Sequence, residues 1–65
     1  MTTRTHRYHG HELVLNRDSD DRYWVKIFDP KGNRIASTGS HLERQGALIE
    51  ASRHVDRLLA QRPAT

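Results

Sequence analysis

Residues 22–35 read RYWVKIFDPKGNRI, and this stretch decides the fold. Aromatic and β-branched side chains follow one another from Tyr23 to Phe28, which is typical of a strand. The next segment, DPKGN at 29–33, predicts a turn, because its proline presets φ for an early turn position and its glycine or asparagine can take φ > 0. The chain then returns as a second strand, so the stretch is a β-hairpin.

A further strand precedes this hairpin. Leu13 and Leu15 alternate with Val14 in HELVLN, which predicts a strand with one apolar face and one partly apolar face. The polar segment 17–21, RDSDD, ends it. The connections are short enough to make neighbouring strands antiparallel. The predicted strands lie at about 10–16, 22–29 and 33–38.

A helix is expected after the third strand, where the period of the apolar pattern changes from two to about 3.6. We expect it at about 41–61, with Ser40 and Glu43 as an S-x-x-E capping box and Pro63 ending it. Gly46 costs about 1 kcal/mol relative to alanine inside a helix, so it is either a tolerated surface residue or a point of close approach by another chain. The predicted core-facing band comprises Leu48, Ala51, Ser52, Val55, Leu58 and Leu59.

These elements predict an α+β fold. Residues 1–65 form a single domain, a three-stranded antiparallel β-meander packed on one C-terminal α-helix in the order β-β-β-α. A chain this short buries only about 60% of the surface that its unfolded form exposes. It has no cysteine, so packing without disulfides or thiolate metal sites must hold the fold together.

The two faces of the sheet pose the main question, because one helix covers one face and the other face of an antiparallel sheet is ordinarily polar. Here Trp24, Lys26 and Phe28 are left facing outward beside Val14, with Tyr8 as a further candidate. An apolar patch with a cationic rim is typical of an interaction site. The expected helix-facing residues are Leu13, Leu15, Tyr23, Val25, Ile27 and Ile35.

Other interpretations of this surface stay open at the level of sequence. The two faces of the sheet could be reversed, with Trp24 and Phe28 in the core. Residues 2–8 could fold over the sheet and cover the aromatic side chains. If neither holds, the surface serves self-association or binds another macromolecule.

The run YWVKIFDPKGNRIAST at 23–38, followed by a helix, resembles the arm-type DNA-binding domains at the N-terminus of phage and transposon integrases. The resemblance extends from Tyr23 to about Ala51 and implies that the sheet face away from the helix enters the major groove of DNA. The DNA-facing residues that it implies are Trp24, Lys26, Phe28 and Arg34. The chain also resembles small stand-alone proteobacterial proteins in its opening YHGHELVL, its single-tryptophan strand and its helix, which implies no activity.

We therefore expect a small, non-catalytic, bacterial binding module. Its first predicted function is nucleic-acid binding, with DNA as the ligand, through the sheet face opposite the helix. The alternative is protein interaction or homodimerisation through the same face. Eleven Lys+Arg against eight Asp+Glu give a net charge of +3, which supports a polyanionic partner only modestly. The predicted binding residues are Arg22, Trp24, Lys26, Phe28, Lys31 and Arg34.

Catalytic, cofactor and metal sites are not expected. No serine lies in a G-x-S-x-G context, and a chain this small can hardly enclose a nucleophile, a base and an orienting group. His6, His9 and His11 lack a carboxylate or cysteine at ligand spacing, so no metal site is predicted. No apolar run suits a signal peptide or a membrane span, which favours a cytoplasmic protein without membrane contact.

Overall fold

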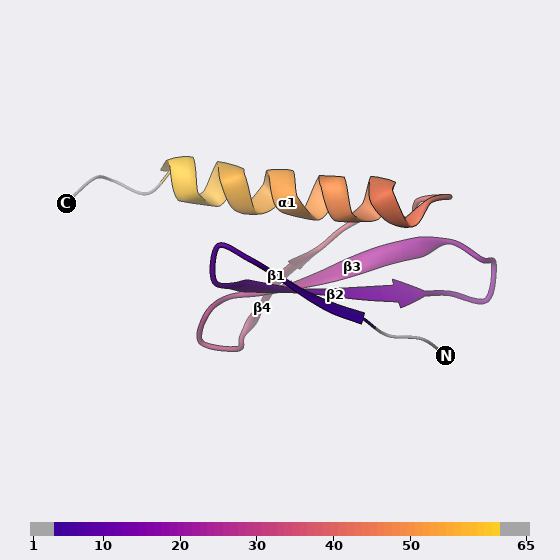
Figure 1. The fold of residues 1–65 in the computed structure, drawn as a ribbon, viewed down its shortest axis with the longest axis horizontal. Coiled ribbons are helices and arrows are strands. Elements are labelled where there is room, and N and C mark those ends of the chain that lie inside the picture. Colours follow the sequence, from indigo (N-terminus) through magenta and orange to yellow (C-terminus); the bar gives the residue numbers. More distant parts are fainter. Residues whose placement is uncertain (1–3, 62–65) are drawn as a thin grey trace.

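The computed structural model describes residues 4–61 and contains an antiparallel sheet followed by one helix (Figure 1). The sheet has the strand order β1-β2-β3-β4, so sequential strands are neighbours throughout. The fold is α+β as predicted, but the sheet has four strands and not three. The elements are β1 (Arg4–Tyr8), β2 (His11–Arg17), β3 (Tyr23–Phe28), β4 (Arg34–Ser37) and α1 (Arg44–Gln61).

Strand β1 is the element that the sequence did not predict. It pairs with the edge of β2 through a tight turn in which His9 has φ 51° and Gly10 has φ 78°. Two successive positive φ values define a type I′ turn, whose twist matches that of the flanking strands. The expectation that residues 2–8 could fold over the sheet is therefore wrong for residues 4–8, because they extend the sheet sideways, and residues 2 and 3 lie outside the described part of the chain.

The two longer hairpin loops share one construction. In the β3–β4 loop, Oδ1 of Asp29 accepts hydrogen bonds from the backbone N–H groups of Lys31 and Asn33 at 2.9 and 2.8 Å. Gly32 takes φ 90°, as expected for one of the last two loop positions. The β2–β3 loop repeats this arrangement with Asp18 as the acceptor, so an aspartate at the loop start organises each turn.

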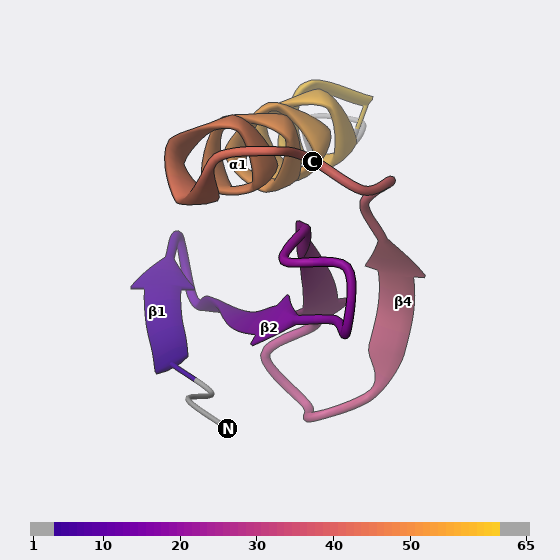
Figure 2. The ribbon, with the colours of Figure 1, turned by 90° about the vertical axis from the view of Figure 1, so that its right-hand side faces the viewer.

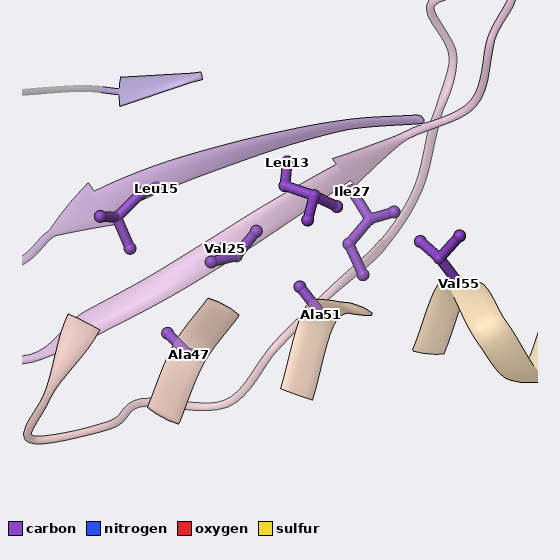
Figure 3. Close-up of a cluster of buried hydrophobic side chains, with 7 residues drawn as sticks. All are labelled: Leu13, Leu15, Val25, Ile27, Ala47, Ala51 and Val55. Carbon is purple, nitrogen blue, oxygen red and sulfur yellow. The ribbon is translucent and has the colours of Figure 1, made fainter. Parts of the chain in front are cut away.

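The core lies between α1 and one face of the sheet (Figure 3). The helix contributes three buried residues at intervals of four, and two of these are alanines, so its backbone can approach the larger side chains of β2 and β3. Burial of this set is the main source of stability. The buried apolar residues are Leu13, Leu15, Val25, Ile27, Ala47, Ala51 and Val55.

The predicted orientation of the sheet is confirmed, with one exception. Val25 and Ile27 are fully buried against the helix, and Tyr23 packs at the margin of the core. Ile35, which was expected beside them, lines a hollow with Leu58 and Leu59 of the helix but is 41% exposed and lies outside the core. The register shift between Ile27 and Phe28 pairs Ala36 with Ile27 and Arg34 with Phe28, so Ile35 is the bulge residue and has no partner on β3.

The helix begins later than predicted. The backbone of His41 pairs with that of Tyr23 as an isolated antiparallel bridge, with N–O distances of 2.7 and 2.8 Å in the two directions. This extended pairing is incompatible with helix at residue 41, so the predicted Ser40–Glu43 capping box is wrong, and α1 starts at Arg44. Pro63, which was predicted to end the helix, lies outside the described residues.

Gly46 is explained by the same His41. A Cβ atom at position 46 would lie 3.1 Å from Nδ1 of the His41 ring. The ring cannot move aside freely, because its Nε2 is hydrogen-bonded to a carboxylate oxygen of Glu50. Gly46 is therefore not an unconstrained surface position. It accommodates a side chain from the preceding loop.

This packing predicts a dependence between two substitutions. Gly46→Ala alone is expected to leave the free energy of unfolding unchanged or lower, because the clash with His41 cancels the gain in helix propensity. In a His41→Ala background, the same change should raise it by up to about 1 kcal/mol. Urea denaturation of the four proteins in this cycle measures the difference, and an equal gain in both backgrounds would contradict the contact.

The sheet curls toward the helix at its edges. Viewed end-on in Figure 2, β1 and β4 lie on the two sides below α1 and rise toward it. On the β1 side, the Tyr8 hydroxyl donates a 2.8 Å hydrogen bond to Oδ1 of Asp56 on the helix. Tyr8 therefore faces the helix, and its proposed place on the opposite surface is wrong.

The Tyr8–Asp56 bond predicts a pH dependence. The hydrogen bond to the Asp56 carboxylate raises the pKa of Tyr8 above its ordinary value of 10.0. A raised pKa means that the contact stabilises the fold while the phenol is neutral, and that this stabilisation is lost as the pH rises through the folded-state pKa.

Urea denaturation at pH 8 and above pH 10 should show a fall in stability that is smaller in Tyr8→Phe than in the unaltered protein. The phenylalanine variant corrects for other groups that titrate in this range. An identical fall in both proteins would show that the Tyr8 hydroxyl does not hold β1 against the helix.

Candidate nucleic-acid interface

The sheet face opposite α1 has no covering element among residues 4–61. Strand registers place ten side chains on it, because residues that pair across antiparallel strands share a face. We call this surface the outer face. It consists of Thr5, Arg7, Glu12, Val14, Asn16, Trp24, Lys26, Phe28, Arg34 and Ser37.

The middle of the outer face is formed by alternate residues of β3. Trp24, Lys26 and Phe28 are all half-buried, although no other element covers them. The Lys26 ammonium lies 5.3 Å from the centre of the Trp24 ring, a cation–π contact. At about 3.3 Å per residue, the two aromatic side chains are separated by about 13 Å along the strand. The surface therefore offers two aromatic groups with a cation between them.

Neighbouring strands supply polar groups around this stripe. Asn16 pairs with Trp24, and Arg34 pairs with Phe28 at the opposite end. At the β1 edge, Arg7 forms an exposed ion pair with Glu12 at 3.7 Å. Arg7 was missed from the sequence because the strand that carries it was not recognised.

The six predicted binding residues do not form one compact cluster. Trp24, Lys26, Phe28 and Arg34 share the outer face, as the strand registers require. Arg22 and Lys31 are exposed in the loops before and after β3. The positive charges therefore follow the length of β3 and extend past both of its ends.

Asp29 lies in this line of charges, between Phe28 and Lys31 in the chain. Backbone N–H groups, that of Asn33 first, hold the pKa of Asp29 below its ordinary value. Its carboxylate is therefore ionised at neutral pH, where it acts as the acceptor in the β3–β4 loop. It shapes the loop that presents Lys31 rather than offering a proton for chemistry.

Two hollows are lined by residues of the sheet and of α1. The larger, of about 410 Å³, lies near the C-terminal end of α1, where Ile35, His54 and Leu58 are among its lining residues. Its wall includes His11, which is 5% exposed and hydrogen-bonded through Nδ1 to the backbone oxygen of His9 at 3.0 Å. His11 is therefore a buried residue, held by a hydrogen bond within the chain.

The described part of the chain contains no cluster of side chains suited to bind a metal ion. Within residues 4–61, no three His, Asp or Glu side chains are arranged to hold a metal ion. His9 lies in the β1–β2 turn and His11 points toward the helix, so the H-x2-H-x-H spacing does not bring its members together.

The smaller hollow, of about 140 Å³, is lined by arginines and lies near the N-terminal end of α1.

Comparison of the chain with protein-family models, curated proteins and solved structures finds no match in any of the three. The resemblance to arm-type DNA-binding domains stays a prediction. No helix among residues 4–61 is both long and apolar enough to span a bilayer.

Proposed function

We propose that the protein binds nucleic acid through the outer face, with unpaired bases stacking on Trp24 and Phe28 and phosphates meeting Lys26 and Arg34. One observation carries this proposal: two aromatic side chains flank a lysine on an inner strand of the sheet, on the face away from the helix. Sheets that bind single strands present aromatic side chains in this way.

Stacking supplies the affinity in this proposal. Each base on an aromatic side chain contributes about 1–3 kcal/mol, and the gain tolerates any sequence because every base has a π-face. The separation of about 13 Å between Trp24 and Phe28 leaves room for the sugar-phosphate chain to pass Lys26. Arg34 beside Phe28 offers a second cation to the backbone.

The apolar character of β3 favours unpaired bases over a duplex. A two-stranded ribbon such as β2–β3 can enter a major groove about 12 Å wide, where polar side chains read the base edges. Here two of the three β3 side chains on the outer face are an indole and a phenyl ring, which cannot form the paired hydrogen bonds of such a reading. Major-groove binding is therefore the second outcome of the experiment below.

The alternative partner is a second copy of the chain, because Val14 lies beside the aromatic stripe and adds to its apolar area. Two sheets pack about 10 Å apart, and stable interfaces bury upward of about 1,000 Å². The edges of this sheet bend toward the helix, so its outer face is convex and two such faces would meet along a narrow ridge. This shape favours a strand of nucleic acid.

Fluorescence anisotropy of a labelled single strand of about ten nucleotides tests the proposal. Trp24→Ala should weaken binding by about five- to a hundredfold, the equivalent of one lost stack. Lys26→Gln should reduce the slope of log affinity against log salt by about 0.7, the value for one phosphate contact. Arg57→Gln, the same charge change on the exposed side of α1, is the matched control.

Unlabelled duplex of the same sequence, added as a competitor, distinguishes the two modes. Weak competition is expected, whereas a duplex that competes better than the single strand indicates major-groove binding. Equal affinity of the unaltered protein and Trp24→Ala contradicts the proposed surface. Light scattering that shows a dimer dissociated by Trp24→Ala, without oligonucleotide binding, would establish the interaction module instead.

A further inference from the structure

Three arginines line one small hollow between the end of the sheet and the start of α1. They come from β1, β2 and the start of α1, and the hollow has a volume of about 140 Å³. No acidic side chain is among its lining residues. The lining consists of Arg4, Leu15, Asn16, Arg17, Tyr23 and Arg44.

Several residues that line this hollow are held in place by contacts within the fold. Leu15 belongs to the buried core, and Tyr23 is held by its backbone bridge to His41. The guanidinium of Arg44 lies over the Tyr23 ring at 5.8 Å from its centre, a contact that orients the charged group. The hollow is therefore built from ordered elements and not from a loop alone.

The charge of the hollow is not fully neutralised by its surroundings. Arg17 forms an exposed ion pair with Asp21 in the β2–β3 loop. The hollow has three guanidinium groups and no acidic side chain in its lining, and one of the three is ion-paired, so its lining carries an excess of positive charge. The first turn of α1, which begins at Arg44, contains no acidic residue that would reduce it further.

We propose that this hollow binds a phosphate group. Guanidinium groups present planar pairs of N–H donors that match the oxygens of phosphate, and several of them suit a doubly charged anion. The volume is below the roughly 300–1,000 Å³ of pockets that enclose whole drug-sized ligands, so one anionic group enters rather than a complete nucleotide. The phosphate is either free or the terminal group of a larger molecule.

This site is separate from the proposed stacking surface, and it does not depend on it. Asn16, which lines the hollow, pairs with Trp24, so both features lie at the same end of the sheet. A strand that stacks on Trp24 could therefore place a terminal phosphate in the hollow by turning around the end of β2.

Titration of inorganic phosphate into isotope-labelled protein at about 20 mM salt, followed by backbone amide shifts, tests the site. Saturable shifts are expected at Arg17, Tyr23 and Arg44. The double variant Arg4→Gln/Arg44→Gln should weaken binding about tenfold or more, because it removes two charged donors. Arg53→Gln/Arg57→Gln makes the same charge change on exposed helix positions and should bind as the unaltered protein does.

A second variant keeps the test decisive if the double variant fails to fold. Asp21→Asn removes the carboxylate that competes for Arg17, and asparagine also tolerates the positive φ of this position. It should bind phosphate about threefold more tightly, as expected for loss of one exposed ion pair. Unsaturable shifts, or equal weakening by the two double variants, would overturn the proposal.

The source of the phosphate is resolved by comparing oligonucleotides with and without a 5′-phosphate. Tighter binding of the phosphorylated form, lost in Arg4→Gln/Arg44→Gln, identifies a nucleic-acid end as the ligand. Equal affinity of both forms, together with saturable binding of inorganic phosphate, identifies a small phosphate compound. Trp24→Ala should retain the phosphate response, so failure of the stacking surface and failure of this site are distinguishable.

Discussion

One helix packs on one face of the sheet, but the inner strand β3 carries large apolar side chains on both of its faces. Three small helical residues, Ala47, Ala51 and Val55, are fully buried against Val25 and Ile27. Their size lets α1 lie close to the sheet and exclude water from one face. The chain described in residues 4–61 has no second layer for the other face, so Trp24 and Phe28 remain outside the core.

The position of this helix is fixed by the segment that leads into it. The Thr38 hydroxyl accepts a hydrogen bond from the N–H of Val25 and donates one to the carbonyl of Gly39, each at 2.9 Å. The bridge between Tyr23 and His41 then continues the pairing along β3. These bonds satisfy backbone groups that would otherwise be exposed at the sheet edge, and they set where α1 starts.

The sequence predicted the features whose signals are local. The β3–β4 hairpin follows from strand-forming residues around a loop with Pro30 and Gly32, and the core face follows from the alternation of Leu13 and Leu15. Strand β1 was missed because RTHRY contains no alternating apolar residues, although Gly10 after His9 is a recognisable turn signal. The late helix start was missed because the bridge joins residues far apart in the chain.

The two candidate sites, the outer face and the arginine-lined hollow, also differ in how local their sequence signals are. Trp24, Lys26 and Phe28 could be placed on one face because they alternate along a single strand. The arginine-lined hollow could not be predicted, because Arg4, Arg17 and Arg44 are distant in sequence and come together only when β1 pairs with β2 and α1 crosses the sheet. A mild net charge of +3 conceals this concentration of cations.

The central claim is that the outer face stays uncovered and receives stacked bases. Trp24 is the single tryptophan of the chain, so intrinsic fluorescence reports on this face directly. Titration with an unlabelled single strand should quench its emission to a plateau, and added salt should restore it. Emission that does not change at oligonucleotide concentrations where binding is detected by other means would contradict the claim.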